Sequence, residues 1–582
     1  MIDQTRWPGR VGYRLWAAAA VILACLSPVW AQEALSRRIS IRNDARVEAL
    51  LRDFEKKIPE LMAKTGPPGL SVALVDRDGS VWARGFGMTD ETNGRPVDPD
   101  TIFSIQSISK TYTATGILRA VQSGSLKLDV PITTYLPGFT VNSRFENHPE
   151  KRMTLRILLS HRGGFTHESL IGNNYYAEFP SFEAHVKSIS DTWLRYPVGQ
   201  RYSYSNLGID LAGYILQVVS RKPFAQVMKD TVLDPLEMKS SSFDWTRTRA
   251  NTNRAIGHAK GFSTVPLEFA IIPSGALYSS AADMTKYIQF QLNEGRVSGK
   301  SILDAKLLKE MGSIQFPLDG QESGYGLGVS RAKRNGSFLL NHGGGGFGFL
   351  SNMTWYPEYG IGIVVLTNST DHPLMSLPNQ ILDGILKPYA EETKPAPAAG
   401  PKPWAASVSL IKKIIGTYVG RSDFLTIVEQ NGKGVVNVSG KTAGTFEFIS
   451  DSNAFLVQPS SATAHLRFFF AADGSPSFKV VIESGAAYDY NDGPNDGPGP
   501  GKPEWDRYVG KYAYMTWGQL ERSIEVHRKN GYLYCDQLRL AEYMPGLFFS
   551  TTGEALDLRG DVPTWRNIRL VKKGEPQPAA PK

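Results

Sequence analysis

A proline-rich stretch at residues 391–406 divides this chain into two parts of different character. It contains Lys-Pro-Ala-Pro-Ala-Ala-Gly-Pro-Lys-Pro, a composition typical of a stiff linker. A second interruption, rich in Gly, Pro and Asp, lies at 491–505. These breaks predict a large N-terminal domain over 42–390 and a C-terminal β module in two halves, 407–490 and 506–575.

The N-terminal part has strand-like runs at both ends and a mainly helical region between them. Apolar side chains recur at helical spacing over 44–64. Two β-like runs, 70–75 and 81–88, flank an Asp-Arg-Asp-Gly turn. Helical and loop patterns follow from about 101 to 310, and strand-like runs return between 325 and 367. This order predicts an α+β fold with an antiparallel sheet and a helical lobe.

The C-terminal module consists of short alternating apolar segments, the pattern of an all-β fold. Its halves begin with similar Gly-x-Tyr triplets at Gly416 and Gly510. Either the halves are related to each other or the triplets agree by chance. Two sheets that each have one apolar face bury those faces by pairing, so we expect the halves to form a barrel or sandwich together.

The first residues have the pattern of an export signal. Three arginines precede an uncharged stretch at 15–31, and Val29 and Ala31 provide small side chains for a cleavage site. The apolar centre is shorter than the about 20 residues that a membrane helix needs. We predict that 1–31 is a signal peptide and that the mature protein is periplasmic or secreted. A retained membrane anchor, or a lipid attached to Cys25, is the alternative.

Charge and cysteine content exclude several classes of protein. The formal net charge is +8 and the basic residues are scattered, which argues against a nucleic-acid partner. The two cysteines, Cys25 and Cys535, are too few for a disulfide scaffold, a zinc finger or an iron–sulfur cluster. The histidines form no paired metal-ligand motif, so we expect no metal and no cofactor. His161 and His167 are expected to serve structure.

The first candidate catalytic motif is Ser107-Ile108-Ser109-Lys110. Serine and lysine three residues apart share one face of a helix. A lysine amine in a desolvated pocket can lose its proton and then accept the proton of the serine hydroxyl. A serine at a helix N-terminus also brings its own N–H beside the attacked carbonyl. A solvated lysine beside an N-cap serine is the alternative interpretation.

Two further motifs follow. In Tyr204-Ser205-Asn206 a phenol near an ammonium group can serve as a general base, and the Asn206 amide can orient a substrate. His342 is followed by four glycines, Gly343–Gly346, which let the backbone approach a ligand closely and expose its N–H groups. Taken singly, each motif has a structural interpretation, as a packed tyrosine or a glycine hinge.

In this order and at this spacing the three motifs resemble those of the serine β-lactamase/penicillin-binding-protein-like superfamily, in its class C branch. That branch includes D-Ala-D-Ala carboxypeptidases, D-aminopeptidases and esterases. Residues 155–165, 196–199 and 274–284 also resemble segments of the family. The resemblance covers about 45–385 and implies a β-lactamase/transpeptidase-like antiparallel sheet with a helical lobe.

The resemblance implies roles for seven residues. The three catalytic residues would be Ser107 as the nucleophile, Lys110 as its activator and Tyr204 as the general base. The four substrate-binding residues would be Asn206, His342, Gly344 and Gly345, of which the last would give the oxyanion N–H that complements that of the serine.

His342 departs from the family pattern. The segment that is Lys-Thr-Gly in β-lactamases is His342-Gly343-Gly344 here. The lysine gives a fixed cation that holds the carboxylate of a β-lactam or a D-Ala terminus, whereas histidine near neutral pH is at most a part-time cation. Histidine at this place resembles the esterase and peptidase members. We therefore expect an exported serine hydrolase acting on small esters or D-amino-acid peptides.

Several alternatives stay open. The first is a β-lactamase or D-Ala-D-Ala carboxypeptidase, and the second is a non-catalytic protein that binds cell-wall peptides or serves assembly. An α/β-hydrolase is disfavoured because the chain has no Gly-x-Ser-x-Gly motif. A P-loop at 295–301 is disfavoured because the motif is one residue short. The C-terminal module is a candidate for shielding the cleft, selecting substrates or forming a homo-oligomer.

Overall fold

The structure is a computed structural model, and it describes most of the chain. The described residues are 38–173, 180–259, 270–317, 322–370, 374–391, 407–419, 424–438, 441–448, 450–457, 463–470, 476–482, 487–492, 501–515, 523–550 and 552–573. The predicted signal peptide at 1–31 lies outside them, as do most of the two predicted linkers. No helix within the described ranges is long and apolar enough to cross a bilayer.

A seven-stranded sheet in the order β2-β1-β11-β10-β9-β8-β7 forms the centre of the N-terminal domain, and all its strand pairs are antiparallel. The strands are β1 (Gly69–Asp76), β2 (Gly79–Gly87), β7 (Gly324–Tyr325), β8 (Ser330–Arg334), β9 (Ser337–Gly346), β10 (Phe349–Tyr356) and β11 (Ile361–Thr367). Every residue of β1 and β11 is buried, because helices cover both faces of the sheet there.

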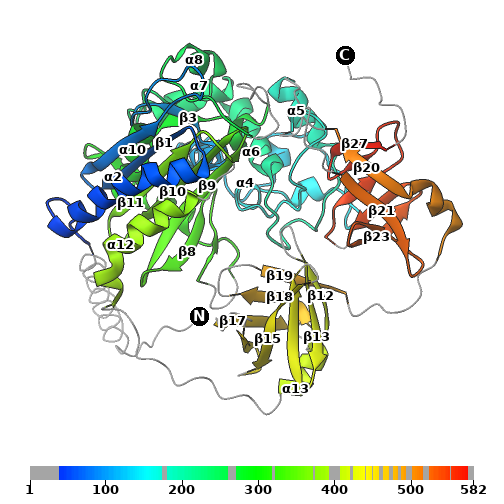
Figure 1. Cartoon of the computed structure of the whole chain (residues 1–582). Coiled ribbons are helices and arrows are strands. Elements are labelled where there is room, and N and C mark those ends of the chain that lie inside the picture. Colours follow the sequence, from blue (N-terminus) through cyan, green and yellow to red (C-terminus); the bar gives the residue numbers. More distant parts are fainter. Residues whose placement is uncertain are drawn as a thin grey trace, which may run out of the picture.

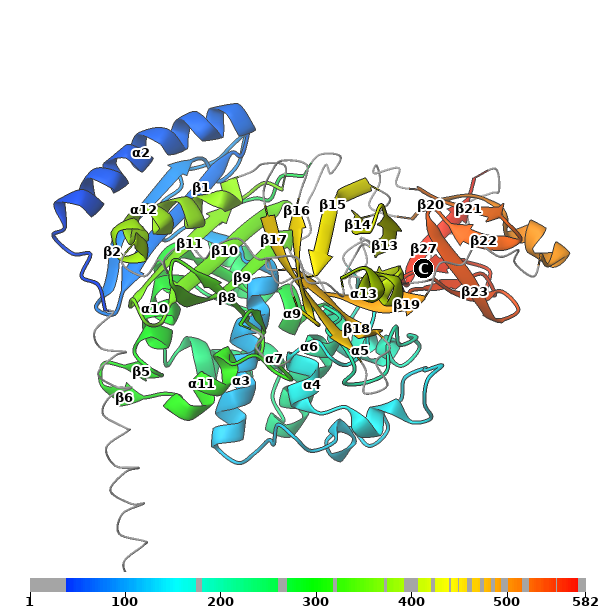
Figure 2. The ribbon, with the colours of Figure 1, turned by 90° about the horizontal axis from the view of Figure 1, so that it is seen from below.

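The two faces of the sheet pack against different helices. Val72 and Leu74 of β1 belong to the core with α2 (Ala45–Thr65) and α12 (Leu377–Glu391), whereas Ala73 and Val75 belong to the core with α10 (Ala281–Leu292). Successive strand residues point to opposite faces, so the uninterrupted apolar runs are what a doubly covered sheet requires. Figure 2 shows α2 and α12 on one side of the sheet and α10 on the other.

The helical lobe continues the α10 side of the sheet, and one hydrophobic core runs through both. Its helices are α3 (Ser109–Gln122), α4 (Leu155–Leu159), α5 (Phe182–Ile189), α6 (Asn206–Ser220), α7 (Phe224–Met228), α8 (Trp245–Ala250), α9 (Ile272–Gly275) and α11 (Ala305–Gly312). Short strand pairs complete it: β3 (Ile102–Ser104) with β4 (Tyr278–Ser280), and β5 (Arg296–Val297) with β6 (Lys300–Ser301). The predicted α+β fold with a helical lobe is confirmed.

Two closed eight-stranded antiparallel barrels follow. The first is closed by the pairing of β12 with β19, and the second by the pairing of β20 with β27. The first consists of β12 (Gly416–Val419), β13 (Phe424–Gln430), β14 (Lys433–Val438), β15 (Lys441–Phe448), β16 (Asn453–Val457), β17 (Thr463–Phe470), β18 (Pro476–Ile482) and β19 (Ala487–Asp492). The second consists of β20 (Gly510–Tyr514), β21 (Ser523–Lys529), β22 (Tyr532–Cys535), β23 (Leu538–Met544), β24 (Leu547–Ser550), β25 (Ala555–Asp557), β26 (Thr564–Trp565) and β27 (Ile568–Lys572). Helix α13 (Ser407–Ile414) precedes the first barrel. Figure 1 shows the second barrel beside the helical lobe, near α5.

The all-β prediction is confirmed, but the expectation that the two halves pair with each other was wrong. Each half has its own hydrophobic core, because eight strands are enough to close a barrel whose interior side chains fill it. The Gly-x-Tyr triplets occupy equivalent places in the two barrels. Tyr418 Oη donates to Ile414 O at 2.7 Å, and Tyr512 Oη donates to Tyr508 O at 2.8 Å. This common hydrogen bond favours the interpretation that the barrels are related.

Candidate active site

Ser107 lies in the short 3-10 turn Gln106–Ile108, directly before α3. The preceding residue, Gln106, has a φ of 50°, a conformation that costs a non-glycine residue about 1–3 kcal/mol. Hydrogen bonds hold the segment on both sides: Ile105 N donates to Leu277 O at 3.0 Å, and Ser351 Oγ donates to Ile105 O at 2.8 Å. The sharp turn leaves Ser107 half-exposed between buried neighbours.

Lys110 is completely buried one turn further along. Its Nζ lies 2.9 Å from Ser107 Oγ, 2.8 Å from Asn206 Oδ1 and 2.8 Å from Ser274 O. The structure therefore brings together two of the predicted motifs, which lie 96 residues apart between Lys110 and Asn206. Serine and lysine are within the distance that direct proton transfer requires.

The Tyr-Ser-Asn motif has a separate task for each residue. Tyr204 is buried, and its ring centre lies 5.0 Å from Lys110 Nζ. Ser205 caps α6, because its Oγ accepts the N–H of Leu207 at 3.1 Å. Asn206 is the first residue of α6 and directs its amide oxygen at Lys110. A helix cap thus fixes the tyrosine and the asparagine relative to the lysine.

His342 lies on β9, close to the tyrosine. Its ring centre is 6.3 Å from that of Tyr204, and only 5% of the residue is exposed. His342 Nδ1 lies 2.6 Å from Gly343 O, and Nε2 lies 2.9 Å from Tyr325 Oη. A carbonyl oxygen only accepts, so Nδ1 carries the proton, and Nε2 can then accept from the phenol. A neutral imidazole satisfies both contacts.

Gly344 allows β9 to run beside the segment that precedes the serine. A Cβ at this position would lie 2.1 Å from Ile105 O and 2.4 Å from Ser351 Oγ, so a side chain there would collide with backbone. At Gly343 the nearest atom to such a Cβ is Ser351 O at 3.7 Å, an ordinary contact. The oxyanion role of Gly345 stays a prediction.

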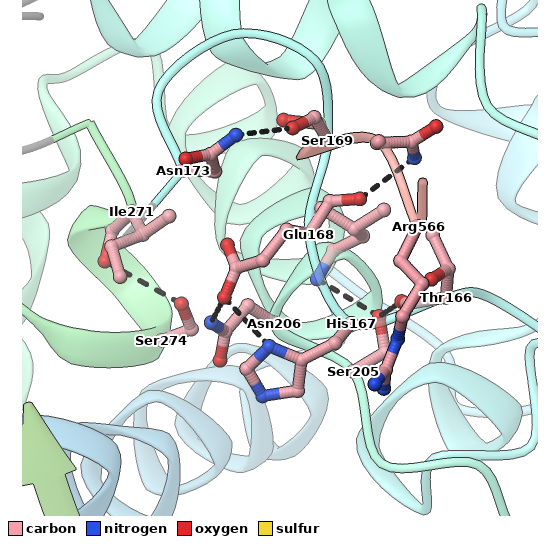
Figure 3. A network of polar contacts seen from close by, with 12 residues as sticks. Thr166, His167, Glu168, Ser169, Asn173, Ser205, Asn206, Ile271, Ser274 and Arg566 are labelled. Atoms are coloured by element: carbon pink, nitrogen blue, oxygen red, sulfur yellow. Dashed lines mark hydrogen bonds and ion pairs between the residues drawn. The ribbon is translucent and has the colours of Figure 1, made fainter. Parts of the chain in front are cut away.

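Sequence reasoning missed a carboxylate beside these residues. Glu168 is 2% exposed, and its Oε1 accepts from Asn206 Nδ2 at 2.8 Å and lies 2.6 Å from His167 Nδ1. Asn206 N also donates to His167 O at 3.1 Å. The ring of His167 stacks on that of Tyr204, with centres 5.7 Å apart. Figure 3 shows that one oxygen of the Glu168 carboxylate contacts both Asn206 and His167.

A second missed carboxylate lies behind the lysine. Asp210 stands one turn after Asn206 on α6, and it accepts from Ser274 N at 2.9 Å and from Ser274 Oγ at 3.0 Å. His185 Nε2 lies 3.2 Å from the same carboxylate. Burial lowers the pKa of His185, but the hydrogen bond and charge of Asp210 outweigh it, and the net result is a raised pKa. The pair fixes the segment whose carbonyl accepts from Lys110. The signal in the sequence for Asp210 is its position four residues after Asn206, which places the two side chains on the same face of a helix.

Residues 54–382 match the family model described as Beta-lactamase. The chain belongs to the beta-lactamase family. This confirms the resemblance drawn from the three motifs. The matched segment spans the sheet and the helical lobe and ends before the two barrels.

Curated relatives share this domain at moderate identity. "Beta-lactamase-like protein 2" of Dictyostelium discoideum is 29% identical over 48% of this chain and 52% of its own length. "D-alanyl-D-alanine-carboxypeptidase/endopeptidase AmpH" of Escherichia coli K12 is 28% identical over 55% and 84%, respectively. "Protein flp" of Staphylococcus aureus MW2 is 28% identical over 52% and 59%. The chain thus spans about half the length of the Dictyostelium and Staphylococcus relatives.

Solved structures share the fold. An octameric penicillin-binding protein homologue from Pyrococcus abyssi superposes with a TM-score of 0.52 at 22% identity, covering 75% of this chain and 99% of its own. SurE superposes with a TM-score of 0.54 at 21% identity, covering 76% and 99%. The β-lactamase/transpeptidase-like fold is therefore confirmed.

Proposed function

We propose that this member of the beta-lactamase family is a serine hydrolase in which Ser107 attacks an ester or amide carbonyl. The observation that carries the proposal is the 2.9 Å contact between Ser107 Oγ and the buried Lys110 Nζ, at the end of a helix and beside Tyr204. The attack forms an acyl-enzyme and releases an alcohol or amine, and water then releases the acid.

The surroundings of Lys110 suit an amine that accepts a proton. A neutral amine has two N–H bonds and one lone pair. Asn206 Oδ1 and Ser274 O occupy two directions around Nζ and can only accept, so the lone pair then faces Ser107 Oγ. Lys110 takes the serine proton as the bond to the carbonyl carbon forms. Tyr204 passes a proton to the leaving group and later takes one from the attacking water, and Lys110 returns its proton to Ser107 Oγ as the acyl–oxygen bond breaks.

The oxyanion of the tetrahedral intermediate would lie between the N–H groups of Ser107 and Gly345. The close approach of β9 at Gly344 supports this, because it brings the strand beside the residues that precede the serine. Loss of one oxyanion donor generally lowers a rate by about 10²–10³-fold.

The substrates that we propose are small esters or peptides containing D-amino acids. His342 fits as a neutral imidazole, and Gly343 has no hydroxyl. This strand therefore lacks both the fixed cation and the hydroxyl of the Lys-Thr-Gly pattern, and it is the cation that would hold a substrate carboxylate. D-alanyl-D-alanine carboxypeptidase activity is the second candidate, favoured by the relative AmpH. β-Lactamase activity ranks behind both.

Activity on three substrate classes tests the proposal. Short-chain p-nitrophenyl esters, D-Ala-terminated peptides and a chromogenic cephalosporin are assayed in parallel, together with labelling by a fluorophosphonate. Ser107→Ala should abolish label and turnover, whereas Ser123→Ala, beyond the other end of α3, should keep both. A folded wild-type protein that takes no label and turns over none of the substrates would instead be a binding protein.

Two further properties are proposed with it. Export is proposed from residues 1–31, and the N-terminal sequence of protein purified from the extracytoplasmic fraction tests it, because it should begin near residue 32. Assembly of several copies through the barrels is proposed from the octameric Pyrococcus neighbour. Light scattering of the purified protein tests assembly, and a mass near 64.1 kDa for the full chain would exclude it.

A further inference from the structure

We infer that the second barrel takes part in catalysis. Glu554 and Asn567 are positioning residues that hold the loop of Thr166 and Glu168, and this loop in turn orients Asn206 and Lys110. The inference rests on the proposed hydrolase function. It goes beyond that function because the beta-lactamase family match ends at residue 382, long before the second barrel begins.

Glu554 forms a buried ion cluster between the barrel and the helical lobe. It is 2% exposed and accepts from Thr166 Oγ1 at 2.7 Å. Arg195 Nε of the lobe lies 3.0 Å from its carboxylate, and Arg566 Nε of the barrel lies 3.3 Å from it. Burial raises the pKa of Glu554, but the two arginines and Thr166 outweigh it and lower the pKa overall. A buried carboxylate with these partners holds them in one geometry, because removing a partner leaves part of the carboxylate charge uncompensated.

The backbones of the two parts also meet closely beside this cluster. Thr552 O accepts from Arg195 Nη2 at 3.0 Å and from Tyr196 Oη at 2.9 Å. Gly553 has a φ of 77°, and a Cβ there would lie 2.5 Å from Arg195 O. Only glycine fits at this approach. The interface therefore depends on backbone contacts as well as on side-chain contacts.

Asn567 contacts the loop at Glu168, whose carboxylate accepts from Asn206. Its Nδ2 donates to Glu168 O at 2.8 Å, and the residue is 8% exposed. Arg566 and Asn567 have φ values of 57° and 63° and form the two-residue turn between β26 and β27, the geometry of a type I′ hairpin. One rigid turn thus presents Arg566 to Glu554 and Asn567 to Glu168.

A continuous path of hydrogen bonds leads from this turn to the nucleophile. Asn567 Nδ2 donates to Glu168 O, the Glu168 carboxylate accepts from Asn206 Nδ2, and Asn206 Oδ1 accepts from Lys110 Nζ, which contacts Ser107 Oγ. Every distance along the path lies between 2.8 and 2.9 Å. A shift of the loop therefore displaces the amide that orients the lysine, and a misplacement of about 1 Å can lower a rate about 10²-fold.

The test uses the full chain with two variants of the barrel and two matched controls. Asn567→Gly removes the amide but keeps the positive φ that the turn needs, and Asn530→Gly makes the same change at an exposed turn of the same barrel. Glu554→Gln is matched by Glu542→Gln, whose carboxylate pairs with Lys502, a residue that precedes the barrel, and not with the helical lobe. For each protein we would measure the rate of fluorophosphonate labelling, kcat and KM per labelled site, and the Tm.

We expect labelling and kcat to fall about tenfold to a hundredfold in Asn567→Gly and in Glu554→Gln, with KM little changed and both controls at the wild-type values. Counting kcat per labelled site removes the effect of unfolded molecules. Wild-type labelling and kcat in both barrel variants, whether or not the Tm falls, would overturn the inference and leave the barrel a stabilising neighbour. A wild-type protein that takes no label would refute the proposed function instead.

Discussion

Replacing Gly344 by alanine tests whether the approach of β9 to the serine segment controls catalysis. The new Cβ would lie 2.1 Å from Ile105 O, whereas a carbon and an oxygen need roughly 3.3 Å. The strand and the segment before Ser107 must therefore separate by about 1 Å. Such a displacement should slow acylation about 10²-fold, and the overpacking should lower the free energy of unfolding by about 1–3 kcal/mol.

Gly343→Ala is the matched control on the same strand, because its Cβ meets no atom closer than 3.7 Å. The assay is the rate of labelling by a small fluorophosphonate, with urea unfolding measured on the same samples. Gly343→Ala should label at a rate close to that of the wild type. Equal labelling rates for the two alanine variants would refute the reasoning, since they would show that the contact at Ile105 does not set the geometry of the serine.

His342→Lys introduces the cation of the family pattern. It should raise kcat/KM for D-Ala-terminated peptides about tenfold, because one charge-assisted hydrogen bond is worth about that factor. An unchanged ratio of peptide turnover to ester turnover would contradict this. Tyr204→Phe keeps the ring but removes the phenol, so acylation by a D-Ala-terminated peptide and acyl release should both slow by about 10²-fold or more, and wild-type turnover would exclude Tyr204 as the base. The raised pKa of His185 gives stability that is complete below its ordinary value of 6.5 and is lost as the pH rises through the folded value. Asp210→Asn should therefore reduce the loss of unfolding free energy as the pH rises above 6.5, as measured with urea; an unchanged pH dependence would show that Asp210 does not hold the imidazolium.

The parts of the fold that could be predicted are those with a local signal. Uninterrupted apolar runs such as those of β1 and β11 indicate strands covered on both faces, and alternating runs indicate the β-rich C-terminal region. Which strands pair is a different question, because alternation shows which residues share a face but not which neighbour a strand takes. That is why the sequence predicted β structure after residue 407 but not two separately closed barrels.

The site shows the same difference between local motifs, which could be predicted, and contacts between distant residues, which could not. Ser107, Lys110, Tyr204, Asn206 and His342 lie in short motifs with a recognisable order, and the structure brings them to one place. The carboxylates beside them had no such signal. One is a single acidic residue in a loop, and the other is the single charged residue of helix α6. Their importance comes only from partners that are distant in the chain.

The contacts of the second barrel have a consequence for how the protein matures. Thr166 and Glu554 are separated by 388 positions, and Glu168 and Asn567 by 399. During synthesis on the ribosome, the loop of Thr166 and Glu168 is made hundreds of residues before the barrel residues that it contacts. Under the role that we propose for the barrel, Ser107 lacks its working geometry until that stretch has been made, and a product cut short by an early stop codon or a protease would keep the serine but be inactive.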